Sequence, residues 1–258
     1  MSIRKQVVTV IIPCYNEGKS IKKVIRDFNK SELTKEIFDF DILVVDNNSK
    51  DDTALMAQEA GARIIIETRQ GKGFAMRSGF ANIAPNAKYV VMLDGDDTYR
   101  PEEVLRMLEP LHHKFCDAVV GSRLSGKIHG DGMTKLHLGG NWFFTFIVRN
   151  FYPANVTDVL SGYFAWKREV IDNLAPNLKS HGFAVEMEMI TKMARLGYDI
   201  YSVPISYHHR AGESSLKPFG DGLKILKMFL KNLRWENPEA IEAKVEIEKL
   251  EKLTEVQA

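Results

Sequence analysis

The sequence predicts an α/β fold in which a mostly parallel central sheet carries helices on both faces. Short β-branched runs alternate with segments of helical character, which is the pattern of successive βαβ units. The run VVTVII at 7–12 is apolar at nearly every position, as a strand buried on both faces is. Turn residues bound each run. Of the 258 residues, 45% are hydrophobic and 27% are charged, so the chain can bury one large core or two small ones.

The alternation is regular over the first half of the chain. Pro101 suits the first turn of a helix, where its missing N–H costs nothing. Asp51 or Asp52 is expected to cap the helix that begins at Thr53. The predicted strands are 7–13, 42–46, 63–67, 89–94 and 118–122, and the helices between them are 20–30, 53–60, 73–83 and 101–111.

The second half is less regular. A polar loop is expected at 124–135, and the aromatic segment 142–146 is either core or a surface contact. Residues 218–235 predict a basic amphipathic helix, and 236–258 a charged helical tail. Such a helix is typical of contact with anionic lipid, and packing against the domain is the alternative. Its expected apolar face is formed by Leu226, Phe229, Leu230 and Leu233.

Composition excludes several classes of protein. The formal net charge of +1 gives no broad basic field for nucleic acid. The two cysteines, Cys14 and Cys116, show no pattern that suggests a disulfide, which fits a cytoplasmic setting. No apolar run approaches the roughly 18 residues of a membrane-spanning helix. The protein is therefore expected to be cytoplasmic and either soluble or peripherally attached to the cytosolic face of a membrane.

The run VVMLDGDD at 90–97 is the most informative segment. A buried strand ends here in carboxylates, at the edge of the sheet where ligands of open α/β folds bind. Carboxylates that are crowded together favour a divalent cation, and a phosphate ester commonly accompanies it. A solvated acidic turn is the alternative reading of this run alone.

Other segments at the same edge favour a nucleotide. Tyr15 and Pro13 offer a wall for a base, and Glu17 and Asp46 offer carboxylates for base N–H groups or ribose hydroxyls. The Gly-Lys-Gly turn around Lys72 could present backbone N–H groups and an ammonium to a phosphate, although it lacks the spacing of a phosphate-binding loop.

These segments together resemble a family 2 glycosyltransferase, and in particular the polyprenyl-phosphate (dolichol-phosphate type) sugar transferases. The resemblance covers residues 7–217 and is carried by PCYNE, VDNNSKDDT, DGD and GSR, which begin at 13, 45, 94 and 121. It implies a GT-A type nucleotide-binding fold over 1–217. It also implies inverting, metal-dependent transfer from a nucleotide-diphosphate sugar to a polyprenyl or dolichyl phosphate, with Mg²⁺ or Mn²⁺ as cofactor.

The resemblance assigns roles to individual residues. The implied metal ligands are Asp94, Asp96 and Thr98, the last at a position where the family often has glutamine. The nucleotide sugar is assigned to Pro13, Tyr15, Glu17, Val44, Asp46, Lys72, Asp94, Gly95 and Asp96. The acceptor phosphate is assigned to Arg123, Lys135, Arg210, Ser215 and Lys217, and the catalytic roles to Asp96, Arg123, Arg210 and Glu186.

Alternative functions remain at this stage. A hydroxyl acceptor would need a general base, for which Glu186 or Asp158 is available. A sugar-phosphate nucleotidyltransferase would show a glycine-rich segment after the first strand, where Tyr15 and Glu17 stand instead. A non-catalytic nucleotide sensor would not need the pair of metal acids. The resemblance favours a uridine diphosphate sugar, either glucose or N-acetylglucosamine, and leaves guanosine diphosphate mannose open.

Overall fold

A seven-stranded sheet forms the centre of the molecule. The computed structural model describes residues 5–28, 36–130, 132–210 and 218–238. The strand order is β3-β2-β1-β4-β6-β5-β7, and β6 runs antiparallel to both of its neighbours while the other described pairs are parallel. The strands are β1 (Gln6–Cys14), β2 (Phe38–Asp46), β3 (Arg63–Ile66), β4 (Ala87–Leu93), β5 (Ala118–Ile128), β6 (Tyr163–Lys167) and β7 (Ile200–Tyr207).

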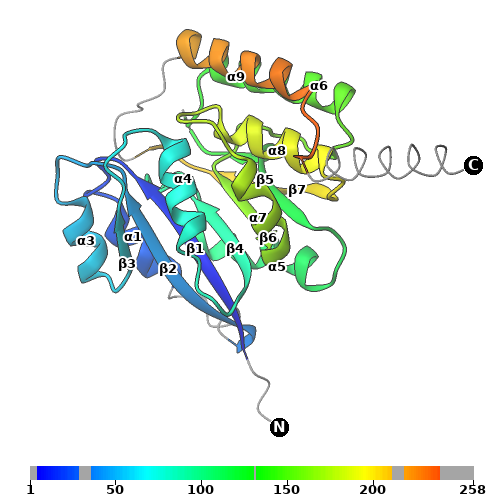
Figure 1. Ribbon diagram of the computed structural model, residues 1–258. Helices are drawn as coiled ribbons and strands as arrows, with labels where there is room; N and C mark the ends of the chain where they lie inside the picture. The colour runs from blue at the N-terminus through cyan, green and yellow to red at the C-terminus, as the bar shows by residue number, and fades with distance from the viewer. Residues whose placement is uncertain (1–4, 29–35, 131, 211–217, 239–258) are drawn as a thin grey trace, which may run out of the picture.

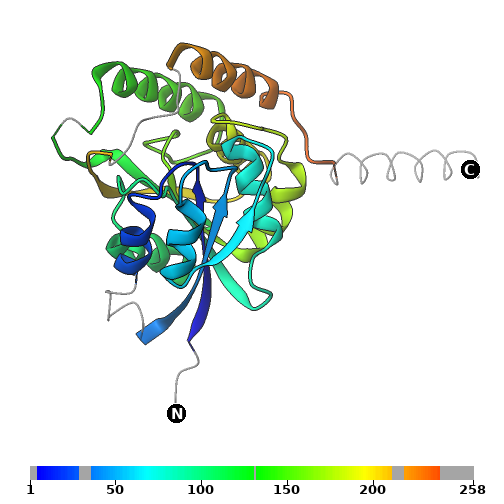
Figure 2. The ribbon, with the colours of Figure 1, turned by 90° about the vertical axis from the view of Figure 1, so that its left-hand side faces the viewer.

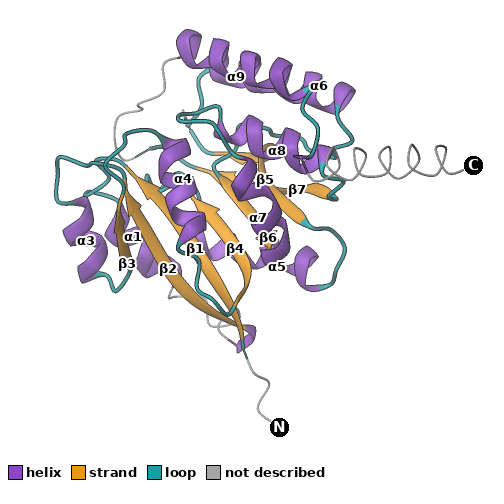
Figure 3. Cartoon of the chain, in the orientation of Figure 1, coloured by secondary structure: helices purple, strands orange, loops and turns teal. Residues whose placement is uncertain are grey.

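Helices cover both faces of this sheet, as predicted (Figure 3). One face carries α1 (Ile21–Phe28), α3 (Thr53–Glu59) and α5 (Val104–His112), the last preceded by the 3-10 turn η1 (Pro101–Glu103). The other face carries α4 (Lys72–Ala81), α7 (Arg168–Leu174) and α8 (Val185–Arg195), with the 3-10 turn η2 (Ala175–Asn177) between the last two. Each face has its own apolar core.

Two further helices, α6 (Lys135–Phe151) and α9 (Pro218–Asn232), lie outside α8 (Figures 1 and 2). They meet at one end, where the ring of Phe229 is 5.8 Å from that of Phe151 and its carbonyl accepts the Tyr152 hydroxyl at 3.1 Å. In this outer layer they stand next to the carboxyl edge of the sheet. The two helices therefore border whatever binds there.

The first half of the chain folds as expected, and the second half differs in three places. β6 and β7 were not predicted, and β5 continues to Ile128 where a polar loop was expected. The end of β5 is exposed over residues 125–127, so it carries polar side chains and resembles a loop. A Cβ built on Gly126 would collide with the Ile205 carbonyl, which explains the glycine in this strand.

The amphipathic helix is present, but its apolar face has another role. Phe229 is buried in the core, and Leu226 and Leu233 are partly buried against it. Domain packing is therefore the role of most of the face that was expected to contact lipid, and Leu230 alone of the four is exposed. Along the described residues, no helix combines the length and apolar character required to cross a bilayer. The predicted tail lies outside the described residues apart from 236–238.

Candidate active site

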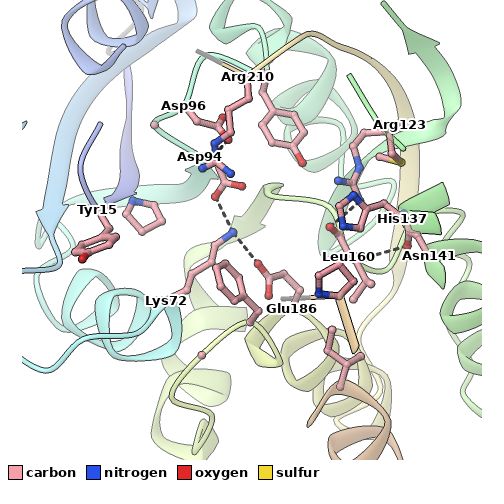
Figure 4. Close-up of a pocket in the computed structure, with 18 of the residues that line it drawn as sticks. Tyr15, Lys72, Asp94, Asp96, Arg123, His137, Asn141, Leu160, Glu186 and Arg210 are labelled. Atoms are coloured by element: carbon pink, nitrogen blue, oxygen red, sulfur yellow. Dashed lines mark hydrogen bonds and ion pairs between the residues drawn. The ribbon is translucent and has the colours of Figure 1, made fainter. Parts of the chain in front are cut away.

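The site predicted from the strand ends forms a cleft of about 490 Å³ at the carboxyl edge of the sheet. Figure 4 shows that it is built from both halves of the chain, with Tyr15 and Asp94 on one side and Arg123 and Glu186 on another. Of the residues named from the sequence, those that line the cleft are Pro13, Tyr15, Glu17, Lys72, Asp94, Gly95, Asp96, Arg123, Glu186 and Arg210.

Several other predicted residues lie outside the lining. Val44 is fully buried in the core because β2 is covered on both faces, so its side chain has no path to the cleft. The Asp46 carboxylate is buried beside it and accepts the Ser49 N–H at 3.2 Å. Lys135 is exposed at the start of α6. Ser215 and Lys217 fall outside the described residues.

Hydrogen bonds to the loop after β2 hold the loop after β1. The Glu17 N–H donates to Thr53 Oγ1 at 2.9 Å, and the Asn16 N–H donates to Ser49 Oγ at 3.0 Å. Asn16 has a left-handed φ of 59°, which asparagine adopts more readily than most residues. Asp51 accepts the Thr53 N–H at 3.1 Å, whereas Asp52, which occupies the N-cap position of α3, makes no capping hydrogen bond with its side chain. These contacts fix the backbone from which Glu17 enters the cleft.

The acidic pair after β4 is anchored by its neighbours. Asp96 is buried, and its Oδ1 accepts the Thr98 hydroxyl at 2.6 Å and the Thr98 N–H at 3.1 Å. Its Oδ2 lies 3.0 Å from Arg210 Nη2, which is also 3.0 Å from Glu17 Oε1. Thr98 therefore orients Asp96, and its role as a third metal ligand stays a prediction.

The electrostatics of these acids suit a divalent cation. Burial raises the pKa of Asp96, and the charge of Asp94 raises it further. Burial also raises the pKa of Glu17 to about 7, against the lowering effect of Arg210. Crowded carboxylates gain from a cation between them, and oxygen ligands suit Mg²⁺ or Mn²⁺. The described residues include no group of three or more histidine, cysteine or acidic side chains arranged to hold a metal.

Asp94 and Asp96 are accordingly the residues that would hold the ion, with phosphate oxygens and water as its other ligands. Two glycines make room for them. A Cβ on Gly95 would lie 2.6 Å from Cys14 Sγ, and a Cβ on Gly162 would collide with the Asp94 carboxylate.

Lys72 joins the two halves of the cleft. Its Nζ lies 2.6 Å from Asp94 Oδ1 and 2.7 Å from Glu186 Oε1. Burial disfavours the charged ammonium, but the two carboxylates outweigh this effect and raise the pKa of Lys72. Burial raises the pKa of Glu186, and Lys72 opposes that rise. Lys72 thus places a fixed positive charge between an acid of the sheet edge and an acid of α8.

One carboxylate oxygen of Glu186 has no hydrogen-bond donor among the described residues. Its Oε2 is buried and accepts no hydrogen bond from the described residues, although the side chain lines the cleft. A buried carboxylate oxygen without a donor is costly, and a hydroxyl-bearing ligand in the cleft would satisfy it. The arrangement fits hydrogen bonding to a sugar, and also the alternative role as a general base.

Arg123 is held in a buried network. Its Nε and Nη2 donate to the two oxygens of Asp158 at 2.7 and 2.8 Å, and Nη2 also donates to the Leu160 carbonyl at 2.6 Å. Asn141 of α6 donates to Asp158 Oδ1 at 2.6 Å. Asp158 is completely buried and engaged on both oxygens, so its geometry favours positioning of Arg123 over the role of a general base.

The adjacent histidines His208 and His209 contact different groups. The ring of His208 stacks on that of His129 with centroids 4.2 Å apart, and His209 Nδ1 lies 2.7 Å from the Arg210 carbonyl oxygen. Each imidazole therefore has a contact of its own.

The sequence did not predict the apolar arm of the cleft. This arm lies between α6 and α9 and continues from the polar site. Phe144 and Ile225 are buried residues of the two helices that line it. The aromatic segment 142–146 and the amphipathic 218–235 were the only signals for it, and their spacing does not show that they face one cleft. The other apolar residues of the arm are Met133, Leu136, Leu160, Phe183, Pro218 and Phe219.

Comparison with known proteins agrees with this arrangement. The family model described as glycosyl transferase family 2 matches residues 9–175. A Haloferax volcanii protein named glycosyltransferase AglJ is 33% identical over 233 residues, which cover 90% of this chain and 73% of the relative. The dolichyl-phosphate hexose transferase of the same organism is 31% identical over 224 residues, covering 87% of this chain and 92% of the relative.

A more distant relative and a solved structure extend the comparison. The undecaprenyl-phosphate mannosyltransferase of Micrococcus luteus is 28% identical over 221 residues, covering 81% of this chain and 87% of the relative. The Mycobacterium tuberculosis glucosyl-3-phosphoglycerate synthase, in complex with Mn²⁺, UDP-glucose and phosphoglyceric acid, has a TM-score of 0.69 at 22% identity. This match covers 88% of the present chain and 80% of the synthase, and shows a shared GT-A fold.

Proposed function

The chain belongs to glycosyl transferase family 2, in the branch of polyprenyl-phosphate sugar transferases, and on that premise we propose the reaction it catalyses. A hexose passes from a nucleoside-diphosphate hexose to the phosphate of a polyprenol, with inversion at the anomeric carbon. The proposed donor is UDP-glucose or UDP-N-acetylglucosamine, in keeping with the UDP-glucose bound by the synthase of similar fold.

One observation carries the choice of a lipid acceptor. The polar end of the cleft, with Asp96, Lys72 and Arg123, continues without interruption into the apolar arm between α6 and α9. Gly140 and Gly222 line this arm, and a Cβ built on either meets nothing within 4 Å. A phosphate joined to a hydrocarbon chain needs this combination of a charged end and an apolar channel. A soluble sugar acceptor would not need the channel.

In the proposed mechanism a phosphate oxygen of the acceptor attacks the anomeric carbon on the side opposite the donor diphosphate. A new bond forms between that carbon and the acceptor oxygen, the bond to the diphosphate breaks, and the nucleoside diphosphate leaves. The acceptor phosphate is already ionised near neutral pH, so the step needs no proton transfer to the protein. A divalent ion, when bound, would offset the charge of the departing diphosphate.

The residues of the cleft position the two substrates. Pro13 and Tyr15 provide the wall for the base, and Lys72 donates to the diphosphate. Glu186 accepts a hydroxyl of the sugar through its free Oε2. Arg123 and Arg210 direct their guanidinium groups toward the acceptor phosphate, since planar guanidinium pairs well with phosphate oxygens.

Access to a polyprenyl phosphate also requires contact with a membrane, and we place this contact on α6 and α9. Trp142 is 63% exposed and Phe146 53% on α6, and Phe219 is 84% exposed on α9. Lys227 and Lys231 are exposed on α9 as well, which suits anionic lipid. The apolar arm opens between the same two helices, so a lipid could enter it from the surface of the bilayer. The protein would thus act peripherally, at the cytosolic face.

The test is transfer of radiolabelled sugar from a panel of nucleotide sugars to a short polyprenyl phosphate, with Mg²⁺, with Mn²⁺ and with a chelator. We expect label in the organic phase from one donor, and loss of that label with the chelator. Release of free sugar without lipid label from every donor would contradict the proposal. Label from GDP-mannose alone would keep the reaction and correct the donor.

A hydroxyl acceptor is the second candidate, because Glu186 has the free oxygen that a general base needs. Glu186→Gln distinguishes the two. With a lipid phosphate as acceptor, we expect turnover to fall about tenfold or less, since the change weakens a hydrogen bond to the sugar and the ion pair with Lys72 but removes no group that must take a proton. With a hydroxyl acceptor, removal of the base would lower kcat by about 10²-fold or more and leave the affinity for the donor intact.

A further inference from the structure

Lys72 stands at the meeting point of the two halves of the cleft, and its place depends on a loop that lies outside the cleft's polar end. The segment 178–184 connects η2 to α8. Its backbone packs directly on the Gly-Lys-Gly turn, where the Gly73 N–H donates to the His181 carbonyl at 3.0 Å. A Cβ on Gly71 or Gly73 would collide with the carbonyl oxygens of His181 and Ser180.

Side chains of the first turn of α4 strengthen this contact. The ring of Phe74 stacks on that of His181, with centroids 4.5 Å apart and planes 12° apart. Arg77 Nη1 donates to the Leu178 carbonyl at 3.4 Å. The start of α4, and therefore the backbone of Lys72, is set by the path of this loop.

A buried ion pair on α8 determines that path. Glu188 Oε2 accepts the Ser180 N–H at 2.6 Å and the Lys179 N–H at 3.1 Å, and its Oε1 accepts the Lys179 N–H at 3.0 Å. Lys192 Nζ lies 2.7 Å from Glu188 Oε1 and also donates to the Asn177 carbonyl. Both side chains are almost completely buried, at 1% and 2% exposed.

Glu188 and Lys192 can act as a clamp, that is, an ion pair that holds the loop 178–184 in place. A carboxylate that accepts backbone N–H groups makes charge-assisted hydrogen bonds, which are about twice as strong as neutral ones. A buried charge without its partner is strongly destabilised, so the carboxylate and the ammonium hold each other in place. Glu188 lies two residues beyond Glu186 on the same helix. One rigid helix therefore carries both the acid that pairs with Lys72 and the acid that holds the loop under Lys72.

We propose that Glu188 and Lys192 are positioning residues for the transfer reaction. Through the loop 178–184 they hold the Gly-Lys-Gly turn so that Lys72 Nζ stands between Asp94 and Glu186, where it can receive the donor diphosphate. Neither residue contacts the substrates. The inference rests on the proposed function for the identity of the donor, but the mechanical link from α8 to α4 is independent of it.

The first measurement is the affinity for UDP with Mn²⁺, determined by calorimetry on the full chain. Glu188→Gln and Lys192→Met are each expected to weaken binding about five- to tenfold, since one buried charge-assisted contact is lost and each tenfold corresponds to about 1.4 kcal/mol. Lys72→Met should weaken binding at least as much. In a double mutant with Lys72→Met, Glu188→Gln should add almost nothing, because it acts through the absent ammonium.

The control is Asp117→Asn. Asp117 also pairs with a lysine, Lys167 at 2.5 Å, and also accepts a backbone N–H, from Asp199 at 3.0 Å. It lies at the opposite end of β5 from the cleft. This change should lower thermal stability, though less than Glu188→Gln because the pair is about a quarter exposed, and leave UDP affinity unchanged. Equal loss of affinity in Asp117→Asn, or full additivity of Glu188→Gln with Lys72→Met, would overturn the proposal.

Hydrogen–deuterium exchange separates failure of this proposal from failure of the proposed function. In Glu188→Gln without any ligand, amides of 71–75 and 178–183 should exchange at least tenfold faster than in the wild type, while those of β1 stay unchanged. If the wild type binds no nucleoside diphosphate but this pattern is seen, the proposed donor is wrong and the clamp stands. Unchanged exchange at 71–75 in both Glu188→Gln and Lys192→Met would contradict the clamp itself.

Discussion

The two ends of the cleft are built on opposite physical principles. At the sheet edge, nearly every polar group is engaged: Thr98 orients Asp96, and the backbone around Glu17 is tied to the next loop. Between α6 and α9 the lining is apolar, and Gly140 and Gly222 leave open space. A small charged ligand requires fixed partners, whereas a hydrocarbon chain requires only an apolar channel of sufficient width. The contrast teaches that the polar end is shaped by hydrogen bonds and the apolar end by volume, as the proposed donor and acceptor require.

The largest effect is expected from the polar end. Asp96→Asn removes a charge from the acidic pair and should lower kcat about 10³-fold, because charge on the departing diphosphate is no longer offset through the ion. Transfer assays across a range of Mn²⁺ concentrations would show this loss. If the variant retained most of its activity, the idea that fixed charges at the polar end support the reaction would be wrong.

Asp97→Asn is the matched control for that experiment. Asp97 is adjacent in sequence, has a φ of 63° that asparagine also tolerates, and forms surface ion pairs with Lys23 and Arg100. Surface pairs contribute little, so activity should stay within about threefold of the wild type.

The apolar end should respond to volume and not to charge. Gly140→Leu fills the arm and is expected to raise the KM for the lipid acceptor by about ten- to one hundredfold, the equivalent of an overpacking cost of 1–3 kcal/mol. The affinity for the nucleotide should not change. Steady-state kinetics with the lipid varied, together with calorimetry on UDP, would check both statements.

Gly140→Ala provides the control at the same position. A single methyl group meets nothing within 4 Å, so acceptor kinetics should be almost unaffected. The helix should gain about 0.5–1 kcal/mol of stability because glycine is a poor helix former. Equal loss of activity in the alanine and leucine variants would argue against a channel.

The surface around the apolar arm gives a smaller effect. Replacing Trp142 and Phe146 together by serine should weaken partition onto vesicles of anionic phospholipid about tenfold, since both exposed rings would no longer enter the interface. Co-sedimentation would measure it. Leu55→Ser, an equally exposed apolar residue on α3, should not change partition. Wild-type protein that stays in the supernatant with all vesicles would refute the proposed membrane contact.

The smallest effect concerns stability at the donor end. Arg69 and then Ser78 lower the pKa of Glu67 to about 2 through hydrogen bonds. Because the pKa of the folded state is depressed, this contribution is fully present above about pH 4.5 and is lost as the pH falls toward 2. Arg69 is largely exposed, so solvent screening keeps the contribution small. Urea unfolding at pH 7 and pH 3 should show that Glu67→Gln removes this part of the pH dependence, and an unchanged dependence would contradict it.

The sequence alone predicted most of the polar half of the cleft, with Val44 and Asp46 as the exceptions. The alternation of apolar runs and amphipathic segments is local, and parallel strands necessarily place their carboxyl ends at one edge. Asp94, Asp96, Glu17 and Lys72 could therefore be assigned to one site before their contacts were known. The motifs within 13–123 also carried the family resemblance, and the comparisons confirmed it.

Only the tertiary structure decided the acceptor half. β6 was missed because a short antiparallel strand is not part of a βαβ unit, and the repeat of such units was the signal in the sequence. The end of β5 was missed because its residues are exposed and polar. The same is true of Asp158, whose carboxylate holds Arg123. That role depends on a pairing between residues that are distant along the chain.

The outer helices α6 and α9 show most clearly what the sequence alone cannot predict. Helical periodicity predicts that Phe229 and Leu230 lie on an apolar stripe, and it does so correctly. It cannot show that α8 and α6 cover Phe229 while Leu230 stays exposed, or that Gly140 and Gly222 leave a channel between two helices. Periodicity records which residues avoid water, because that preference acts within one element. What covers an apolar face, and what space remains beside it, is determined by the packing of elements against one another.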